Sequence, residues 1–184
     1  MGMHLNIPKP LGSLVNVLLS IKHYILAAAS LVMAFVFFFV VILRYLFETD
    51  LFAYEEWVLI FAFWVYFLGG AVGSYENTHV KADFLLSMID NVRTKWMVVN
   101  FTLALEIMIS LVLTYWAWLM LAEELDAYPQ WQTTTGLELP FFIPKLGIFL
   151  GFFFMTFYTA LHLYSGLRDG PSPEWEKDET PPHI

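Results

Sequence analysis

The fold is decided by residues 24–43, which read YILAAASLVMAFVFFFVVIL and contain no charged side chain. At about 1.5 Å of rise per residue, a helix of this length spans about 30 Å, the thickness of the hydrocarbon core of a bilayer. The run is longer than the apolar core of a secretory signal, and no small-x-small cleavage site follows it. It therefore predicts a retained transmembrane helix.

Three further apolar blocks follow along the chain. Residues 57–74 carry no charge, residues 96–122 carry only Glu106, and residues 141–167 carry Lys145 near one end. Backbone polar groups in lipid need partners within their own segment, so these blocks are expected to be helices. The sequence predicts an all-α integral membrane protein with four transmembrane helices, at about 24–47, 55–75, 96–122 and 141–167.

The composition supports this class and excludes several others. Hydrophobic residues make up 59% of the 184 and charged residues only 14%, against about 25% charge in a soluble domain. The net charge of −8 argues against a nucleic-acid partner. The absence of cysteine rules out disulfides and thiolate chemistry. Without a phosphate loop or hydrolase motif either, we expect no enzyme and no catalytic, metal or cofactor site.

Two stretches outside these blocks have helical periodicity. Apolar residues recur with helical spacing at Leu11, Leu14, Val15, Leu18 and Leu19, and again at Phe84, Leu85, Met88 and Val92. We expect short interfacial amphipathic helices that lie along the membrane, the first within an N-terminal segment of residues 1–23. The alternative, that each stretch extends the neighbouring span, stays open, above all for the first. Residues 168–184 are rich in proline and acids and predict a disordered tail.

Basic residues predict the orientation. One side of the predicted topology collects Lys9, Lys22, Lys81, Arg93, Lys95, Arg168 and Lys177, whereas the other has only Arg44 and Lys145. We therefore expect both termini, and the segments 1–23 and 168–184, to be cytoplasmic. The loops around residues 48–56 and 123–140 are expected outside.

Glu106 is the only acid deep inside an apolar block. An ionisable group at bilayer depth is costly, so it is a candidate proton relay or ion ligand. Alternatively the side chain is protonated, or is hydrogen-bonded to a neighbouring helix through groups such as Thr102 or Ser110, one turn away on its own face. A single carboxylate without a second acid in another span makes a poor ion pathway, which favours this structural interpretation.

Arg44 ends the first span, and Glu55 and Glu56 open the second, followed by Trp57 at headgroup depth. An arginine at a membrane edge pairs or extends toward water, so we expect an ion pair between Arg44 and one of these acids. Substrate binding is the alternative. The outer loops hold eight acids against two bases, which indicates either a docking surface for a soluble partner or the mere absence of the positive-inside constraint.

Small residues predict close helix packing in spans two and four. Gly69, Gly70 and Gly73 lie in the second span, and Gly147 and Gly151 in the fourth, at small-xxx-small spacing. Such residues let helix backbones approach closely in lipid. The partner, another helix of this chain or of another protein, is not visible in the sequence.

Histidines suggest a different class of protein, a haem-anchoring or other accessory subunit of a redox complex. His23, His79 and His162 all fall toward the cytoplasmic side of the predicted topology. His79 lies in a loop and the others near helix ends, which disfavours haem ligation. A third hypothesis is a small self-contained transporter that uses Glu106 as its coupling residue.

A series of motifs points to one family. The chain carries VVILRY at 40–45, YEEW at 54–57, WVYFLGGA at 64–71, and His79 followed by Asp83 within HVKAD. Gly136, Leu139-Pro140 and Ile143-Pro144 then precede the fourth span. In order and spacing these motifs resemble the small membrane subunit of tripartite ATP-independent periplasmic (TRAP) transporters. One departure is that Tyr75, Glu76 and Asn77 stand where this family often has a basic residue before the His.

The resemblance implies partners that the composition does not show. In this family a large multi-span membrane subunit carries substrate with sodium, and a periplasmic substrate-binding protein captures it, usually an organic acid. The small subunit packs beside the large one in the bacterial inner membrane. Here we expect such a scaffold, since the chain has no internal repeat and no Gly/Pro-broken pair of spans.

Overall fold

The computed structural model describes residues 9–49, 52–76, 89 and 91–171. Four helices account for most of them: α1 (Lys9–Leu46), α2 (Tyr54–Glu76), α4 (Val92–Asp126) and α5 (Phe142–Asp169). Within these residues β-structure is limited to an isolated bridge between Thr133 and Pro140. All four helices are long and apolar enough to cross a membrane. The all-α membrane fold with four spans is therefore confirmed.

Helix α1 runs without a break from Lys9 to Leu46, a length of 38 residues or about 57 Å. Its only helix-breaking residues, Pro10 and Gly12, stand in the first turn, where proline is tolerated. The N-terminal amphipathic stretch is thus helical but not a separate interfacial helix. It continues the first span, the alternative that the sequence left open. The second such stretch lies mostly outside the described residues.

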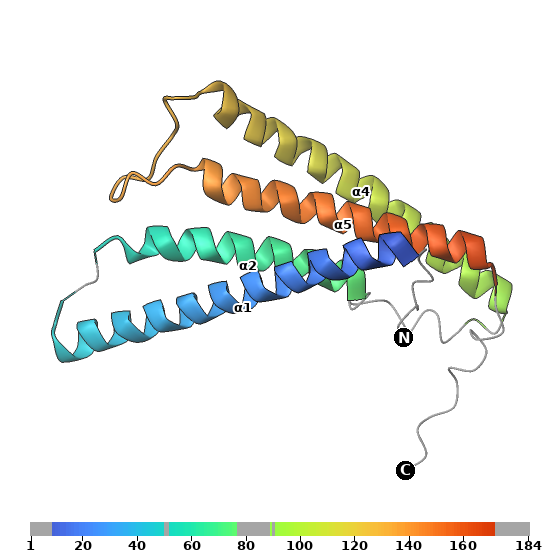
Figure 1. The fold of residues 1–184 in the computed structure, drawn as a ribbon, viewed down its shortest axis with the longest axis horizontal. Coiled ribbons are helices and arrows are strands. Elements are labelled where there is room, and N and C mark those ends of the chain that lie inside the picture. The colour runs from blue at the N-terminus through green and yellow to red at the C-terminus, as the bar shows by residue number, and fades with distance from the viewer. Residues whose placement is uncertain (1–8, 50–51, 77–88, 90, 172–184) are drawn as a thin grey trace, which may run out of the picture.

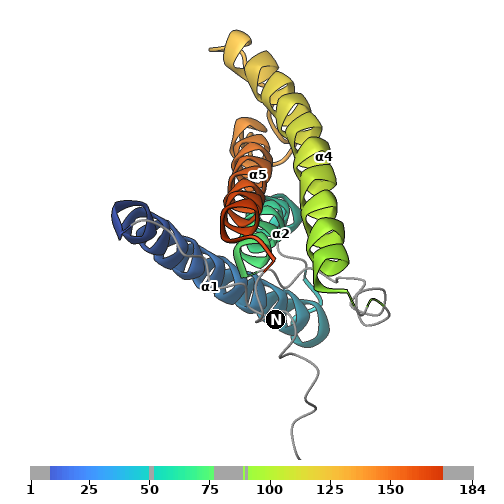
Figure 2. The same ribbon diagram turned by 90° about the vertical axis from the view of Figure 1, so that its right-hand side faces the viewer.

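The helices form a splayed bundle in the spatial order α1, α2, α5, α4 (Figure 1). They converge where α1 begins and α5 ends, which we call the narrow end, and diverge toward the loop 127–141, which we call the wide end. The view along the bundle shows α5 between the other helices, with α4 and α1 on opposite outer sides (Figure 2). Helices α2 and α5 are therefore the inner pair of the bundle, with α1 packed on α2 and α4 packed on α5.

The face of α1 that packs on the bundle runs from Val15 to Val40. Residues screened from solvent recur at alternating steps of four and three: Val15, Leu19, Lys22, Leu26, Ala29, Met33, Val36 and Val40. This spacing of 3.5 residues is that of left-handed helix packing. At the narrow end, Val15 and Leu19 form a core cluster with Val72 of α2 and Tyr158 of α5. Of the amphipathic stretch, Val15 and Leu19 are therefore buried in the bundle.

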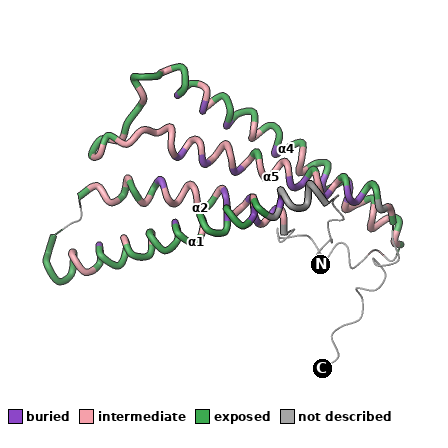
Figure 3. Tube along the Cα trace, in the orientation of Figure 1, coloured by how far each residue is buried: buried purple, intermediate pink, exposed green. Residues whose placement is uncertain are grey.

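The opposite faces of the outer helices are exposed and apolar (Figure 3). On α1 they include Phe35, Phe37, Phe38, Phe39 and Val41. On α4 they include Phe101, Met108, Val112, Tyr115 and Leu119. Exposed apolar surface on this scale is expected of helices surrounded by lipid or by other membrane helices.

Candidate functional site

Helix α5 contacts its two main neighbours through different chemistry. Toward α2 it presents Gly147 and Gly151, and toward α4 it presents hydroxyl and charged groups together with Gly166. We call these the α2–α5 seam (Trp64, Phe67, Gly70, Gly147, Gly151, Met155) and the α4–α5 seam (Glu106, Thr114, Glu124, Lys145, Thr156, Thr159). These two seams set how α5 is held, and they are the candidate functional features of the chain.

In the α2–α5 seam, glycines make room for aromatic rings. A Cβ on Gly151 would lie 2.5 Å from Phe67 Cβ and 2.8 Å from the Phe67 carbonyl oxygen, so the two backbones touch there. The Trp64 ring fills the space over Gly147, and its Nε1 donates to the Ile143 carbonyl at 3.1 Å. The glycines of span four therefore pack on a helix of the same chain, which answers the question that the sequence left open.

The glycines of span two are not equivalent. A Cβ on Gly70 would collide with the end of the flexible Met155 side chain on α5. Gly69 instead faces α1, where the nearest atom is Leu26 Cδ2 at 3.8 Å, an ordinary contact distance. Gly73 is half-buried. Gly70 therefore lies in the α2–α5 seam, whereas Gly69 faces α1.

Pairs of polar side chains cross the α4–α5 seam at three levels, and toward the narrow end Trp96 Nε1 of α4 also donates to the Gly166 carbonyl of α5 at 2.8 Å. At the wide end Lys145 Nζ donates to Glu124 Oε1. Farther along, Thr114 and Thr156 are hydrogen-bonded through their hydroxyls at 3.1 Å. Thr159 Oγ1 then donates to Glu106 Oε1 at 3.1 Å. Interhelical hydrogen bonds of this kind stabilise helix pairs in lipid, by about 0.6 kcal/mol on average where they have been measured in a membrane protein.

In the Glu124–Lys145 pair the carboxylate is buried, with Glu124 only 2% exposed, whereas the Lys145 side chain is 21% exposed. Glu124 stands in the last turn of α4 and Lys145 in the first turn of α5, so each charge has the same sign as the partial charge of its own helix end. Each is therefore stabilised chiefly by the other. The sequence placed both residues in the outer loops or at a helix edge and did not predict the pair.

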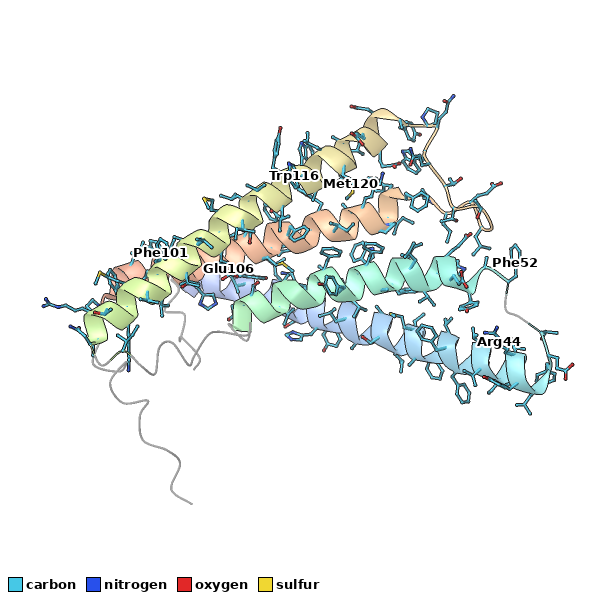
Figure 4. All side chains as sticks on the ribbon, turned by 180° about the vertical axis from the view of Figure 1, so that it is seen from behind. Arg44, Phe52, Phe101, Glu106, Trp116 and Met120 are labelled. Carbon is cyan, nitrogen blue, oxygen red and sulfur yellow. The ribbon has the colours of Figure 1, made fainter. Side chains whose placement is uncertain are left out.

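Glu106 lies near the middle of α4 (Figure 4), at the margin of the contact between α4 and α5. It is half-buried, and its partner is Thr159 of α5. Thr102, one of the groups expected to approach it, instead donates to the Val98 carbonyl of its own helix. The observed geometry agrees with the structural interpretation that Glu106 is hydrogen-bonded to a neighbouring helix.

Lys22 is a buried cation that the sequence did not single out. It is 3% exposed, its Nζ donates to the Tyr158 hydroxyl at 2.7 Å, and the Nζ lies 3.4 Å from the centroid of the Phe154 ring. The contact with two aromatic rings offsets part of the cost of burying the charge. The sequence position of Lys22 could have indicated its burial, because Lys22 occupies a buried position in the 3.5-residue repeat of α1.

At the wide end, Glu56 organises the loop between α4 and α5. Its carboxylate accepts hydrogen bonds from Thr134 Oγ1 at 2.5 Å, Gly136 N at 2.7 Å and Leu137 N at 2.9 Å. Gly136 lies so close that a Cβ there would be 2.9 Å from Glu56 Oε1. The loop is thereby fixed to the start of α2.

The expected ion pair between Arg44 and Glu55 or Glu56 is wrong, since no salt bridge links these described residues. Glu56 faces the loop backbone, and backbone N–H groups of a loop need acceptors of their own. Arg44 is exposed at the end of α1, at the wide end of the bundle (Figure 4). A long charged side chain at a membrane edge is expected to extend toward water. Glu55 and Trp57 are also exposed.

The remaining candidates are histidines and an aspartate. His79 and Asp83 lie outside the described residues. His23 Nδ1 is 2.9 Å from the Leu19 carbonyl oxygen, and His162 Nε2 is 2.8 Å from that of Tyr75. Among the described residues, no three His, Cys, Asp or Glu side chains are grouped so that they could hold a metal ion. Both described histidines thus contact backbone carbonyls of the bundle.

Replacing Glu56 by alanine should loosen the loop between α4 and α5 without unfolding the bundle. The Gly136 and Leu137 amides and the Thr134 hydroxyl would lose their acceptor, so amide exchange across residues 133–139 should accelerate several-fold. Hydrogen–deuterium exchange of the purified protein measures this. The exposed neighbour Glu55 supplies the matched control, Glu55→Ala, for which exchange in the loop should be unchanged. Equal acceleration in both variants would contradict the assignment.

The geometry defines a polytopic membrane protein whose ordered interactions hold helices together. The sequence matches the family described as tripartite ATP-independent periplasmic transporters, DctQ component, over residues 17–169. The chain belongs to this family, the small membrane component of TRAP transporters, as its motifs suggested. No curated protein matches it.

Proposed function

We propose that this chain is the stationary scaffold of its transporter and packs in the inner membrane against the large transport subunit. The observation that carries the proposal is the double attachment of α5, by close glycine contacts to α2 and by polar pairs to α4. A carrier that moves within the bilayer needs a frame that holds its depth. Four spans tied in this way resist tilting and vertical displacement.

The proposal extends to orientation and to the transported substrate. The distribution of basic residues supports cytoplasmic termini, and in that orientation the wide end and its loop would lie in the periplasm. The family resemblance supports sodium-coupled uptake of an organic acid delivered by a periplasmic binding protein. The large subunit would bind the substrate and sodium, and this chain would bind neither.

The loop at the wide end supports a further part of the role, docking of the binding protein. Because Glu56 fixes the loop to α2, the loop presents a defined surface. Acidic side chains are exposed around it, at Glu48, Glu55, Glu123, Asp126 and Glu138. Such a surface is suited to steering a partner with a basic patch.

Affinity purification of the tagged chain from native membranes tests the scaffold function. We expect a much larger membrane protein to co-purify in fixed ratio, and deletion of this chain to abolish uptake of the organic acid. A control pull-down from cells that carry the untagged chain sets the background. Recovery of this chain alone, as a stable species from cells that contain the large subunit, would contradict the proposal.

A further inference from the structure

A second line of residues on α4 runs beside the α4–α5 seam. It recurs at steps of four and three residues and shares Glu106 with the seam, and we call it the α4 strip: Thr102, Glu106, Ile109, Leu113, Trp116 and Met120. Ile109 is 49% exposed and Trp116 is 63% exposed, and Leu113 and Met120 are half-buried. Figure 4 shows Glu106, Trp116 and Met120 along this helix. The strip is thus mostly apolar and in part uncovered.

Glu106 makes the strip unlike an ordinary lipid-facing surface. It stands ten residues into the apolar block that begins at Trp96, about 15 Å along the helix and hence near the bilayer centre. Thr159 donates to Oε1, and among the described residues Oε2 has no hydrogen-bond partner. The half-buried carboxyl group therefore retains unused acceptor capacity at a depth without water.

The exposed face of α1 provides the contrast. Phe35, Phe38 and Val41 are each about half exposed on a helix whose span carries no charge between Tyr24 and Leu43. Lipid tails satisfy such a face fully. They do not satisfy a carboxyl group, whose exposure to hydrocarbon is costly and which is therefore expected to face protein. The α4 strip, not the face of α1, thus requires a partner with a polar group.

We propose that the α4 strip is the surface that contacts the large transport subunit, through a transmembrane helix with a hydrogen-bond donor opposite Glu106. This inference rests on the proposed scaffold function and assigns one face of the chain to it. The donor on the partner is a basic, hydroxyl or amide side chain. It completes the hydrogen bonding of a carboxyl group that Thr159 satisfies only in part.

The absence of cysteine from the chain makes a site-directed test direct. Single-cysteine variants Ile109→Cys, in the α4 strip, and Phe38→Cys, on α1, are labelled with a photo-activated cross-linker in membranes that contain the complete transporter. The two native side chains are similarly exposed, at 49% and 58%. We expect adducts with the large subunit from Ile109→Cys at several-fold higher yield than from Phe38→Cys.

Substitutions at Glu106 test the polar contact. Glu106→Leu should weaken association with the large subunit about three-fold, the effect of losing an interhelical hydrogen bond of the average strength measured in lipid. Glu106→Gln keeps an acceptor and should retain most of the association. Thr159→Val removes only the bond within this chain and should retain it too. Monodisperse elution of each variant shows that the chain is folded.

The outcomes separate this inference from the proposed function. Adducts from Phe38→Cys alone, no adduct from either site in an intact complex, or adducts between two copies of this chain would each overturn the α4 strip as the contact surface and leave the scaffold function standing. An unchanged association of Glu106→Leu would overturn the role of Glu106. Failure of the unmodified chain to co-purify with the large subunit would overturn both proposals.

Discussion

Replacing Lys145 by methionine should destabilise the protein by about 3–5 kcal/mol, because a buried carboxylate then loses its counter-charge. Glu124 is 2% exposed, and its Oε2 has no hydrogen-bond partner, so Lys145 is its main source of stabilisation. Its position at the C-terminal end of α4 adds repulsion from the helix dipole. Denaturant titration of the purified protein in mixed micelles, followed by circular dichroism, measures the loss.

The double variant Glu124→Leu/Lys145→Met supplies the control. Replacing a buried ion pair by apolar groups of similar volume is often neutral, so the double variant should regain most of the lost stability. Coupling of this kind is expected for two residues in contact. A double variant that is as unstable as Lys145→Met alone would show that Lys145 acts through packing and not through its charge.

Replacing Gly151 by leucine should separate α2 from α5 and cost about 3 kcal/mol or more, at the upper end of the range for overpacking. Even the first carbon of the new side chain would meet the backbone oxygen of Phe67 at 2.8 Å, and a backbone does not rotate away as a side chain does. The same titration gives the loss of stability. In a background in which the other tryptophans are replaced by phenylalanine, the change in Trp64 fluorescence on unfolding reports on this seam directly.

Gly69→Ala is the control, because Gly69 lies on the face of α2 that is turned toward α1 and away from this seam. Its new Cβ would meet Leu26 Cδ2 at 3.8 Å, so it fits without movement. Alanine also favours a helix over glycine by about 0.5–1 kcal/mol, and a neutral or slightly stabilising effect is expected. Gly151→Leu and Gly69→Ala with equal losses would contradict the distinction between the two glycines.

The four helices were predictable because apolar runs long enough to span a bilayer leave the backbone no other form. The continuity of α1 was not, since an amphipathic stretch such as residues 11–19 carries the same pattern whether it lies on a membrane or packs in a bundle. The difference depends on Val72 and Tyr158, which reach Val15 and Leu19 only in the folded bundle.

For the candidate site, the sequence predicted which residues take part in helix packing but not which residues they contact. Gly147 and Gly151 indicated close packing, but nothing near them in sequence names Phe67 or Trp64 as the neighbour. Sequence proximity was misleading for Arg44 and Glu56. The backbone amides of Gly136 and Leu137, eighty residues farther along, bind this carboxylate instead. Likewise Glu106 pairs with Thr159, 53 positions away.

The attachment of the loop 127–141 to Glu56 has a mechanical consequence. The loop is the direct link between α4 and α5, and its middle is bonded to the start of α2, so it acts as a cross-tie at the end where the helices diverge. A force applied to this loop by a bound partner is therefore transmitted to α2, α4 and α5 together, and does not deform the loop alone. A force on the wide end is therefore distributed over three of the four helices.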